Sequence, residues 1–208
     1  MLWKLKTLYF IKQYKKHIID CQCGFSSFII DSKLSVVDGE DNILKCGNGL
    51  YINKCVFIIK GSHNKIIIND NCILNACVFI IEDDNNLIEI GEGTTAERDV
   101  QFAALESTKI TIGQDCMFSH DVFLRTSDSH PIYDLNGTRI NNAKNILLGN
   151  HVWIGMQSLI LKGTIIGDNV IVAARSTVTN TSESNPNIIL AGSPAKQIKH
   201  NIQWERTR

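Results

Sequence analysis

A polar insertion in the chain carries a histidine with the chemistry of a general base. Residues 126–145 read TSDSHPIYDLNGTRINNAKN, and His130 stands directly before Pro131. A proline restricts the residue before it to extended backbone conformations, which constrains the direction of the main chain at His130. A neutral imidazole near pH 7 can take a proton from a weak nucleophile such as a hydroxyl group. His130 is therefore the first candidate for a catalytic residue.

A metal site is the alternative use of the histidines. Zinc requires three or four His, Cys, Asp or Glu ligands that converge on one point. No two histidines lie within five residues of each other, and the pair Cys21 and Cys23 has no second close pair. The sequence therefore predicts no metal, while a zinc hydratase with ligands from different subunits stays the alternative. The histidines are His17, His63, His120, His130, His151 and His200.

The elements that would position His130 repeat along the chain. Val56, Val78, Val100 and Val122 recur every 22 residues, and the C-terminal half repeats every six. A period of six fits neither a helix nor an alternating strand. Three hexads, each a short strand with a tight corner, close one coil of roughly 18 residues. The sequence thus predicts an all-β parallel solenoid, whose hexads begin at Leu148, Ile154, Ile160, Ile166, Val172 and Val178.

The insertion 126–145 interrupts this period, since 36 residues separate Ile112 from Leu148. Insertions in repeat proteins gather on one face, which is often the binding face. We expect a basic N-terminal helical cap over 1–22, a β-helix domain over 23–183 that includes the insertion, and a C-terminal loop and tail over 184–208. Contact of residues 1–20 with an anionic membrane surface is the alternative to a purely capping role.

Composition excludes several functional classes. The chain has 208 residues, 44% of them hydrophobic and 20% charged, which indicates one folded domain. Its formal net charge is zero, so a general nucleic-acid binder is not expected. No apolar run approaches the roughly 20 residues that span a bilayer. Seven cysteines without a secretory signal favour reduced thiols and a cytoplasmic location, with the inner face of the membrane as an additional expectation.

Three segments together resemble one enzyme family. They read ITIGQDCMFSHDVFLRTSDSHPIYD, LLGNHVWIGMQSLILKGTIIGDNVIVAARSTVT and LAGSPAKQIK. In this order they resemble the hexapeptide-repeat (left-handed β-helix) acetyltransferases, and within them the sugar and capsular-polysaccharide O-acetyltransferases. The resemblance covers roughly residues 110–199. It implies a left-handed β-helix, acetyl-CoA as co-substrate, His130 as general base, and a homotrimer with sites between subunits.

The resemblance also assigns binding residues. For the acceptor it implies a flat aromatic surface at Trp153, while Asp99 departs from the asparagine of related sugar acetyltransferases. Arg175 stands where the family usually has glycine. The implied acceptor residues are Trp153, Asp99, Ser119, His120 and Arg125. The implied coenzyme A residues are Gly155, Met156, Ala173, Ala174, Arg175, Thr179, Ala191, Gly192, Ser193, Pro194, Lys196 and Lys199.

These observations predict an acetyl-CoA-dependent O-acetyltransferase. The expected acceptor is a sugar hydroxyl of a bacterial surface polysaccharide, capsular or O-antigen, or of its precursor. The acceptor oxygen would attack the thioester directly, because no cysteine lies in the histidine loop to carry the acetyl group. Two alternatives stay open: an N-acetyltransferase on an amino sugar, which the motifs do not separate from the first reading, and a non-enzymatic binding solenoid.

Overall fold

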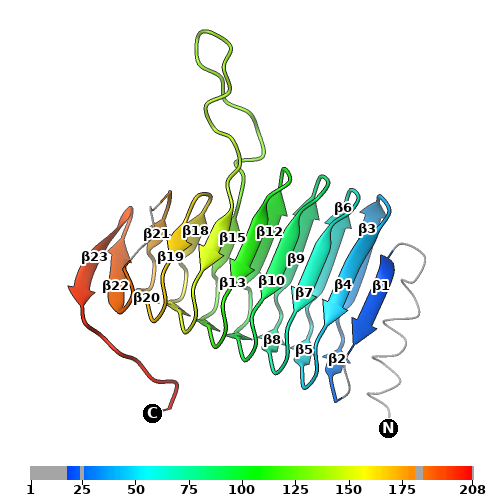
Figure 1. The fold of residues 1–208 in the computed structure, drawn as a ribbon, viewed down its shortest axis with the longest axis horizontal. Helices are drawn as coiled ribbons and strands as arrows, with labels where there is room; N and C mark the ends of the chain where they lie inside the picture. The colour runs from blue at the N-terminus through cyan, green and yellow to red at the C-terminus, as the bar shows by residue number, and fades with distance from the viewer. Residues whose placement is uncertain (1–17, 24–25, 181–184, 208) are drawn as a thin grey trace.

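The chain folds into a three-sided solenoid of parallel strands (Figure 1). The structure is a computed structural model and describes residues 18–23, 26–180 and 185–207. These residues form strands and turns, without a helix. Most of the cap predicted over 1–22 lies outside them, and residues 18–22 belong to a strand instead, because they pair in parallel with residues 42–45 of the next coil. No helix in the described ranges is long and apolar enough to cross a membrane.

Each side of the solenoid is one sheet, and the chain visits the three sheets in turn as far as β21, after which β22 and the antiparallel β23 extend sheet B. Sheet A contains β1 (Ile18–Cys23), β4 (Asn42–Cys46), β7 (Lys65–Ile68), β10 (Leu87–Ile90), β13 (Lys109–Ile112), β16 (Ile146–Leu148) and β19 (Ile165–Ile166). Sheet B contains β2 (Phe28–Ile30), β5 (Tyr51–Asn53), β8 (Ile73–Asn75), β11 (Thr95–Ala96), β14 (Met117–Phe118), β17 (Trp153–Ile154), β20 (Ile171–Val172), β22 (Ile188–Gly192) and β23 (Ala195–His200). Sheet C contains β3 (Lys33–Asp38), β6 (Val56–Lys60), β9 (Val78–Glu82), β12 (Gln101–Leu105), β15 (Phe123–Arg125), β18 (Leu159–Leu161) and β21 (Thr177–Val178).

The register confirms the predicted periods. In sheet A, Leu44 pairs with Ile66, and Ile88 pairs with both Ile66 and Ile110, so each step is 22 residues. The step from Ile110 to Ile146 is 36 residues, and the C-terminal coils then advance by 18. The hexad starts are buried, as an inward-facing apolar position requires. The four extra residues of each long coil lie at the corner between sheets C and A, called the C/A corner below.

If the 22-residue recurrence set the register of sheet C, the four valines would stack in one column; Val56 does pair with Val78, but the next step differs. Val78 pairs with Gln101, not with Val100, so this step is 23 residues long. The register instead places Phe102 below Phe79, and the two fully buried rings stack with centroids 5.0 Å apart. Filling the interior with large aromatic groups therefore decides the register, and the additional residue is absorbed at the corner between sheets B and C, which holds Asp99.

A column of buried polar side chains runs along the C/A corner. The backbone N–H of Asn64 donates to the side-chain oxygen of Asn42 at 3.0 Å, and Asn86 repeats this bond to Asn64 at 2.8 Å. The N–H of Thr108 donates to Asn86, and its hydroxyl donates to Thr126 at 2.6 Å. Turn backbone that cannot join a strand ladder is satisfied in this way. The column ends at Thr126, the first residue of the insertion.

The cysteines are part of the interior. Cys46, Cys55, Cys72, Cys77 and Cys116 are buried free thiols. Burial raises the pKa of the Cys72 thiol to about 11 and that of Cys116 to about 12. Because the thiolate is the reactive form, these two thiols are chemically quiet near neutral pH. Their role is packing between successive coils.

We predict that replacing Asn86 by alanine lowers the free energy of unfolding by about 1–3 kcal/mol, since the buried N–H of Thr108 then loses its acceptor. Urea denaturation of wild type and variant measures this difference. Asn136→Ala is the matched control, because Asn136 is exposed in the insertion and its replacement should change stability by less than about 0.5 kcal/mol. Equal losses in both variants would contradict a stabilising role for the column.

Candidate functional site

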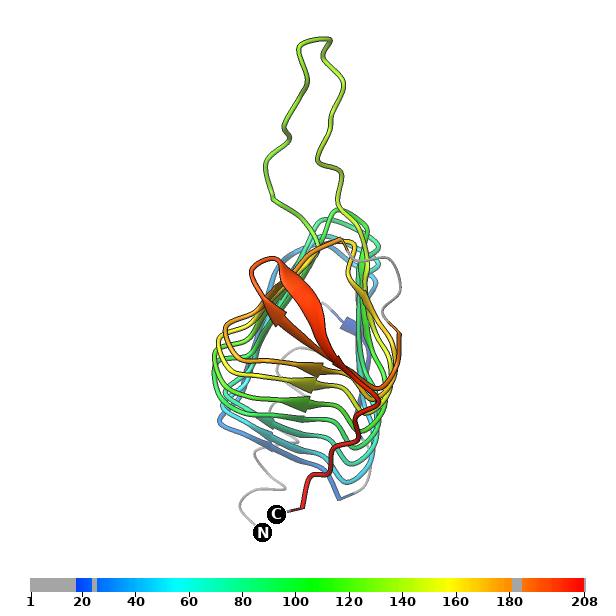
Figure 2. The same ribbon diagram turned by 90° about the vertical axis from the view of Figure 1, so that its left-hand side faces the viewer.

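The insertion is a long loop that projects from the C/A corner (Figures 1 and 2). It connects β15 with β16 and covers residues 126–145, as predicted. The backbone N–H of Lys144 donates to the carbonyl of Thr126 at 3.0 Å, which brings the two ends together. Farther out, the N–H of Ile140 donates to the carbonyl of Ile132. The loop therefore leaves and rejoins the solenoid at one point.

One buried amide fixes the backbone on both sides of His130. Asn141 donates to the carbonyl of His130 at 2.8 Å and accepts the N–H of Ile132 at 2.7 Å. Asn141 is 9% exposed, whereas the side chains of His130 and Pro131 are exposed. The imidazole of His130 is thus free to meet a substrate while its main chain is held.

Asn141 is in turn tied to the next coil. Its amide donates to Asp128 at 2.9 Å, and Asp128 forms an ion pair with Lys162 at 2.5 Å. The ammonium of Lys162 also donates to the carbonyl of Asn141. The hydrogen bond from Lys162 is the main reason that the pKa of Asp128 lies below its usual value. Lys162 follows β18, so this network anchors the histidine loop to the regular solenoid.

A second ion pair holds the other side of the loop. Arg139 contacts Glu106 at 2.7 Å, and the hydroxyl of Ser127 donates to the same carboxylate at 2.5 Å. The hydrogen bond from Arg139, then that from Ser127, lowers the pKa of Glu106. Glu106 lies at the C/A corner just after β12, so the loop leans toward the preceding coil. An open pocket of about 370 Å³ lies beside the pair of Glu106 and Arg139, and it is lined by Glu82, Asp83, Leu105, Glu106, Ser129, Pro131 and Arg139.

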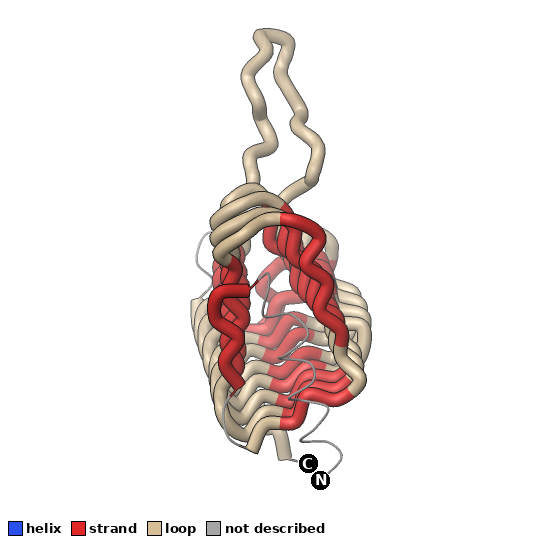
Figure 3. Tube along the Cα trace, turned by 90° about the vertical axis from the view of Figure 1, so that its right-hand side faces the viewer, coloured by secondary structure: helices blue, strands red, loops and turns tan. Residues whose placement is uncertain are grey.

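Most predicted acceptor residues lie away from His130. Arg125 does join the loop, because its guanidinium donates to the carbonyl of Ser127 at 3.1 Å. Trp153 stands half-buried on the outer face of sheet B, and its indole N–H points at the hydroxyl of Ser119 at 3.4 Å. Sheet B is the side of the prism opposite the loop (Figure 3). One chain therefore does not bring Trp153 and His130 together.

The corner between sheets B and C is called the B/C corner below. It holds His120, between β14 and β15, and Asp99, between β11 and β12. His120 has its Nδ1 atom 2.9 Å from Asp121, which orients the imidazole. The carboxylate of Asp99 lies 3.7 Å from the guanidinium of Arg98. This corner borders sheet B, so these two residues accompany Ser119 and Trp153 rather than His130.

Several predicted coenzyme A residues gather at the same B/C corner. Gly155 is required there, since a Cβ at this position would lie 2.5 Å from the backbone nitrogen of Ala174 in the next coil. Arg175 has a φ of +59°, a left-handed conformation that glycine adopts without strain, which agrees with the glycine that the family resemblance implies here. Its side chain does not fill the corner, because it donates to Gln157 at 2.8 Å. Met156 and Ala174 are exposed beside it, and Ala173 is half-buried.

The predicted tail residues complete this region, except for one. The N–H of Gly192 donates to Ser176 at 3.2 Å, which ties the turn between β22 and β23 to the B/C corner. Thr179 follows β21 at the C/A corner and lies apart from the others. Lys196 and Lys199 are exposed on β23. Ala191 and Gly192 end β22, and Ser193 and Pro194 form the turn to β23.

Sequence reasoning missed the residues that hold the loop and the tail. Asn141 and Arg139 contact partners through a fold that no local pattern reveals. The family resemblance assigns coenzyme A residues to the C-terminal segment but gives Trp204 no role, yet this side chain is 8% exposed and stacks on His151. A tryptophan in an otherwise polar tail was the available signal, because large aromatic side chains are usually buried.

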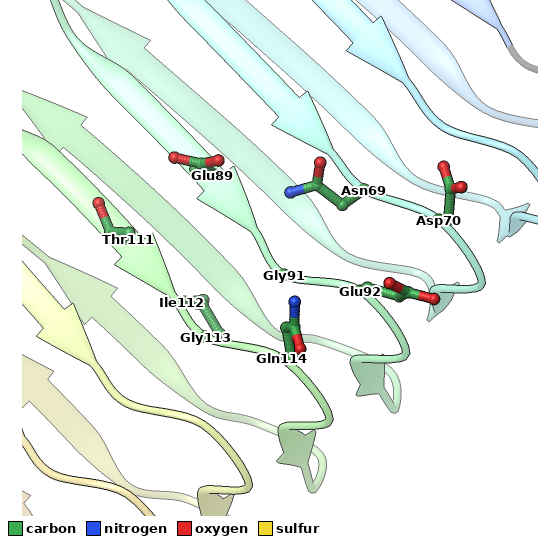
Figure 4. A pocket seen from close by; sticks show the side chains of 9 residues that line it. All are labelled: Asn69, Asp70, Glu89, Gly91, Glu92, Thr111, Ile112, Gly113 and Gln114. Atoms are coloured by element: carbon green, nitrogen blue, oxygen red, sulfur yellow. The ribbon is translucent and has the colours of Figure 1, made fainter.

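A second pocket lies at the corner between sheets A and B, called the A/B corner below (Figure 4). It has a volume of about 430 Å³, and its acidic groups come from successive coils. Two of them serve the solenoid itself, since Asp70 accepts the N–H of Asn48 and Glu92 accepts the amide of Asn71. No group of three or more potential metal ligands occurs among the described residues. The pocket is lined by Asn69, Asp70, Glu89, Gly91, Glu92, Thr111, Ile112, Gly113 and Gln114.

Comparison with known proteins confirms the resemblance to hexapeptide-repeat acetyltransferases. Residues 145–180 match the family described as bacterial transferase hexapeptide (six repeats). A polysialic acid O-acetyltransferase of Escherichia coli O1:K1 / APEC is 42% identical over 103 residues, which are 49% of this chain and 33% of that protein. A polysialic acid O-acetyltransferase of Neisseria meningitidis is 39% identical over 102 residues, 49% of this chain and 47% of that protein. The chain thus spans less than half the length of these two curated relatives.

The fold match extends over more of the chain. The crystallographic structure of the polysialic acid O-acetyltransferase OatWY superimposes with a TM-score of 0.76 and 29% identity. The superposition covers 90% of this chain and 93% of the other. The structure of the polysialic-acid-specific acetyltransferase NeuO matches with a TM-score of 0.55, 28% identity and a coverage of 92% and 90%. The expected left-handed β-helix is therefore confirmed over almost the whole described chain.

We predict that acid loosens the base of the histidine loop. The pKa values of Glu106 and Asp128 are lower in the folded chain than in an unfolded one. Their stabilising contribution is therefore complete above the unfolded values, near pH 4, and is lost as the pH falls through the folded values. Hydrogen exchange of the Ile132 amide, expressed at each pH as a protection factor relative to the intrinsic rate of an unstructured amide, should show lower protection in this acidic range than at neutral pH. In the variant Glu106→Gln/Asp128→Asn, the protection of this amide should no longer depend on pH in this range. Equal protection of the Ile132 amide at both pH values in the wild type would contradict the prediction.

Proposed function

We propose that the chain is an acetyl-CoA-dependent O-acetyltransferase that acts on a sugar hydroxyl of a bacterial surface polysaccharide or of its precursor. One observation carries this proposal: an exposed histidine imidazole on a clamped backbone, projecting from a hexapeptide solenoid. Polysialic acid O-acetyltransferases, whose structures this fold matches, support a capsular polysaccharide as the class of acceptor. The activity of the whole protein stays part of the proposal, since the curated relatives extend well beyond the matched segment.

The chemistry follows from the position of His130. Acetyl-CoA supplies an acetyl group activated as a thioester. The neutral imidazole takes the proton of the acceptor hydroxyl, whose oxygen then bonds to the carbonyl carbon as the carbon–sulfur bond breaks. The proton passes from the imidazolium to the departing sulfur, so no covalent acetyl-enzyme is needed. Asn141, Asp128 and Lys162 keep His130 in place during this proton transfer.

The residues at the B/C corner fit a coenzyme A groove. Small side chains leave room for a thin pantetheine chain at Gly155, Ala173 and Ala174. The ammonium groups of Lys196 and Lys199 on β23 are exposed and suit phosphate as point charges. The segment over 191–194 lies beside this corner through the bond from Gly192 to Ser176. Arg175, folded against Gln157, leaves the groove open.

The separation of His130 from Trp153 supports a site between subunits. We propose a homotrimer in which the loop of one chain reaches sheet B and the B/C corner of its neighbour. The outer face of sheet C supports an interface, because Phe123 is 44% exposed and Leu159 is 38% exposed. Val56, Ile58, Val78 and Ile80 extend the same apolar face. In such a trimer the acceptor lies between His130 of one chain and Trp153, Ser119 and His120 of the next.

We also propose a cytoplasmic location, with peripheral membrane contact through residues 1–20. The free cysteines of the described chain suit a reducing compartment. The basic and apolar residues of the first segment support the contact with an anionic membrane surface.

The first prediction concerns the base. His130→Ala should lower kcat for acceptor-dependent thiol release from acetyl-CoA by about 10²–10⁴-fold, because the hydroxyl then loses its proton acceptor. The assay compares wild type and variant over a panel of sugars and bacterial polysaccharides. His63→Ala is the matched control, since His63 lies at an outer turn of the N-terminal coils and should leave the rate unchanged. Absence of both thiol release and coenzyme A binding in the wild type would instead favour a binding solenoid.

The second prediction concerns the site between chains. His130→Ala and Trp153→Ala should each be inactive alone, whereas a co-refolded equal mixture should recover about one quarter of wild-type activity. One in four interfaces then pairs an intact His130 with an intact Trp153. Size-exclusion chromatography with light scattering checks that mixed trimers form. Mixed trimers without any activity would contradict a shared site.

A further inference from the structure

The C-terminal tail crosses the A/B corner as a strap, defined here as residues 202–207. It leaves β23 and runs back along the coils (Figures 1 and 2). The N–H of Ile202 donates to the carbonyl of Asn187, and Ile202 accepts a bond from the amide of Asn169 at 3.1 Å. Arg206 reaches Asp115 at 2.6 Å and the carbonyl of Cys116 at 2.7 Å. The strap thus contacts several consecutive coils with specific polar bonds.

His151 connects the strap to the solenoid at its centre. Its Nδ1 atom lies 2.6 Å from the carboxylate of Asp115, and its Nε2 atom lies 3.0 Å from the carbonyl of Trp204. Both partners are hydrogen-bond acceptors, so both ring nitrogens of His151 face an acceptor. The ring also stacks on the indole of Trp204, with centroids 3.9 Å apart and 12° between planes.

Trp204 is fixed from its other edge as well. Its indole N–H donates to the carbonyl of His151 at 3.0 Å, so the two residues exchange bonds in both directions. Burial alone would raise the pKa of Asp115, but the bonds from His151 and Arg206 lower it, so this anchor stays a carboxylate at neutral pH. With a relative exposure of 8%, the side chain of Trp204 is buried by packing and does not offer a binding surface itself.

The strap places the indole of Trp204 beside that of Trp153. The two indole rings lie 5.8 Å apart between centroids, tilted by 45°. Trp153 is half-buried on the outer face of β17, and its indole N–H makes a long hydrogen bond to the hydroxyl of Ser119 at 3.4 Å. Met117 and Ile171 flank Trp153 on the neighbouring strands of sheet B. Trp204 lies against the indole from the strap and adds a second aromatic ring to its surroundings.

We propose that Trp204, held by the strap, is a positioning residue for Trp153 in acceptor binding. This inference rests on the proposed function, in which Trp153 presents its indole to the sugar. The orientation of that aromatic face decides how the acceptor hydroxyl lies relative to the base, and small displacements of a bound substrate are costly for the rate. The strap is anchored by the bond between Arg206 and Asp115, and it acts on the acceptor site through the contact of Trp204 with Trp153.

Steady-state kinetics test the proposal. Trp204→Ala should raise the KM for the acceptor about tenfold, with the KM for acetyl-CoA changed by less than about twofold. Trp204→Phe keeps an aromatic side chain and should restore the acceptor KM to within about threefold of wild type. Ile166→Ala is the control for stability, because it opens a cavity in the core of sheet A far from Trp153. An unchanged acceptor KM in Trp204→Ala, or an equal rise in Ile166→Ala, would overturn the proposal.

A second measurement does not depend on acetyl transfer. The chain has three tryptophans, so Trp3→Phe/Trp204→Ala leaves Trp153 as the sole emitter. Its time-resolved fluorescence anisotropy should show a larger fast depolarisation than that of Trp3→Phe/Trp204→Phe. Equal anisotropy decays would overturn the proposal. If the wild type transfers no acetyl group, the proposed function fails, and the anisotropy decays alone decide whether Trp204 restrains Trp153.

Discussion

Parallel hydrogen bonding between successive coils is the constraint on which the whole molecule depends. Each strand from β1 to β22 pairs with a strand of a neighbouring coil, so these strands keep their register and any surplus residue is moved to a corner. The C/A corner takes the four surplus residues of the 22-residue coils, and there a buried column of asparagine and threonine side chains satisfies the turn backbone. The histidine loop begins where this column ends, at Thr126, so the same solution that stabilises the turns gives the loop a fixed base.

The prism then separates the chemical groups. His130 stands beyond one corner, whereas Trp153 and Ser119 lie on the opposite sheet, and the small residues at Gly155 and Ala174 border that sheet. Rigid parallel sheets cannot bend to close this gap within one chain. In the proposed enzyme the association of chains bridges this distance. The polar network around Asn141 positions His130, and the one around Trp204 positions the residues on sheet B. The solenoid itself serves as a spacer between them.

Sequence periodicity predicted the fold because each hexad places one apolar residue inward, from Leu148 to Val178. It also predicted the insertion and its bounds, since lost periodicity marks where strands stop. Periodicity failed in sheet C, where it would pair Val78 with Val100. The strands are instead shifted by one residue, so that Phe79 stacks on Phe102. The strap was beyond reach for a different reason: His151 and Trp204 lie 53 residues apart, and no repeat relates them. The clamp of His130 by Asn141 likewise needs the loop to be folded before it can be recognised.

The bond between Lys144 and Thr126 has a consequence for how such proteins diversify. Because the insertion departs and returns at one spot, its length can vary without shifting any strand, and lengthening it costs only the slowly growing entropy of loop closure. A gene encoding this solenoid could therefore exchange one loop for another in a single event and keep its folded scaffold. Selection acting on the loop is decoupled from selection acting on the coils, so the acceptor could change over evolutionary time while the solenoid, with its proposed coenzyme groove, is inherited intact.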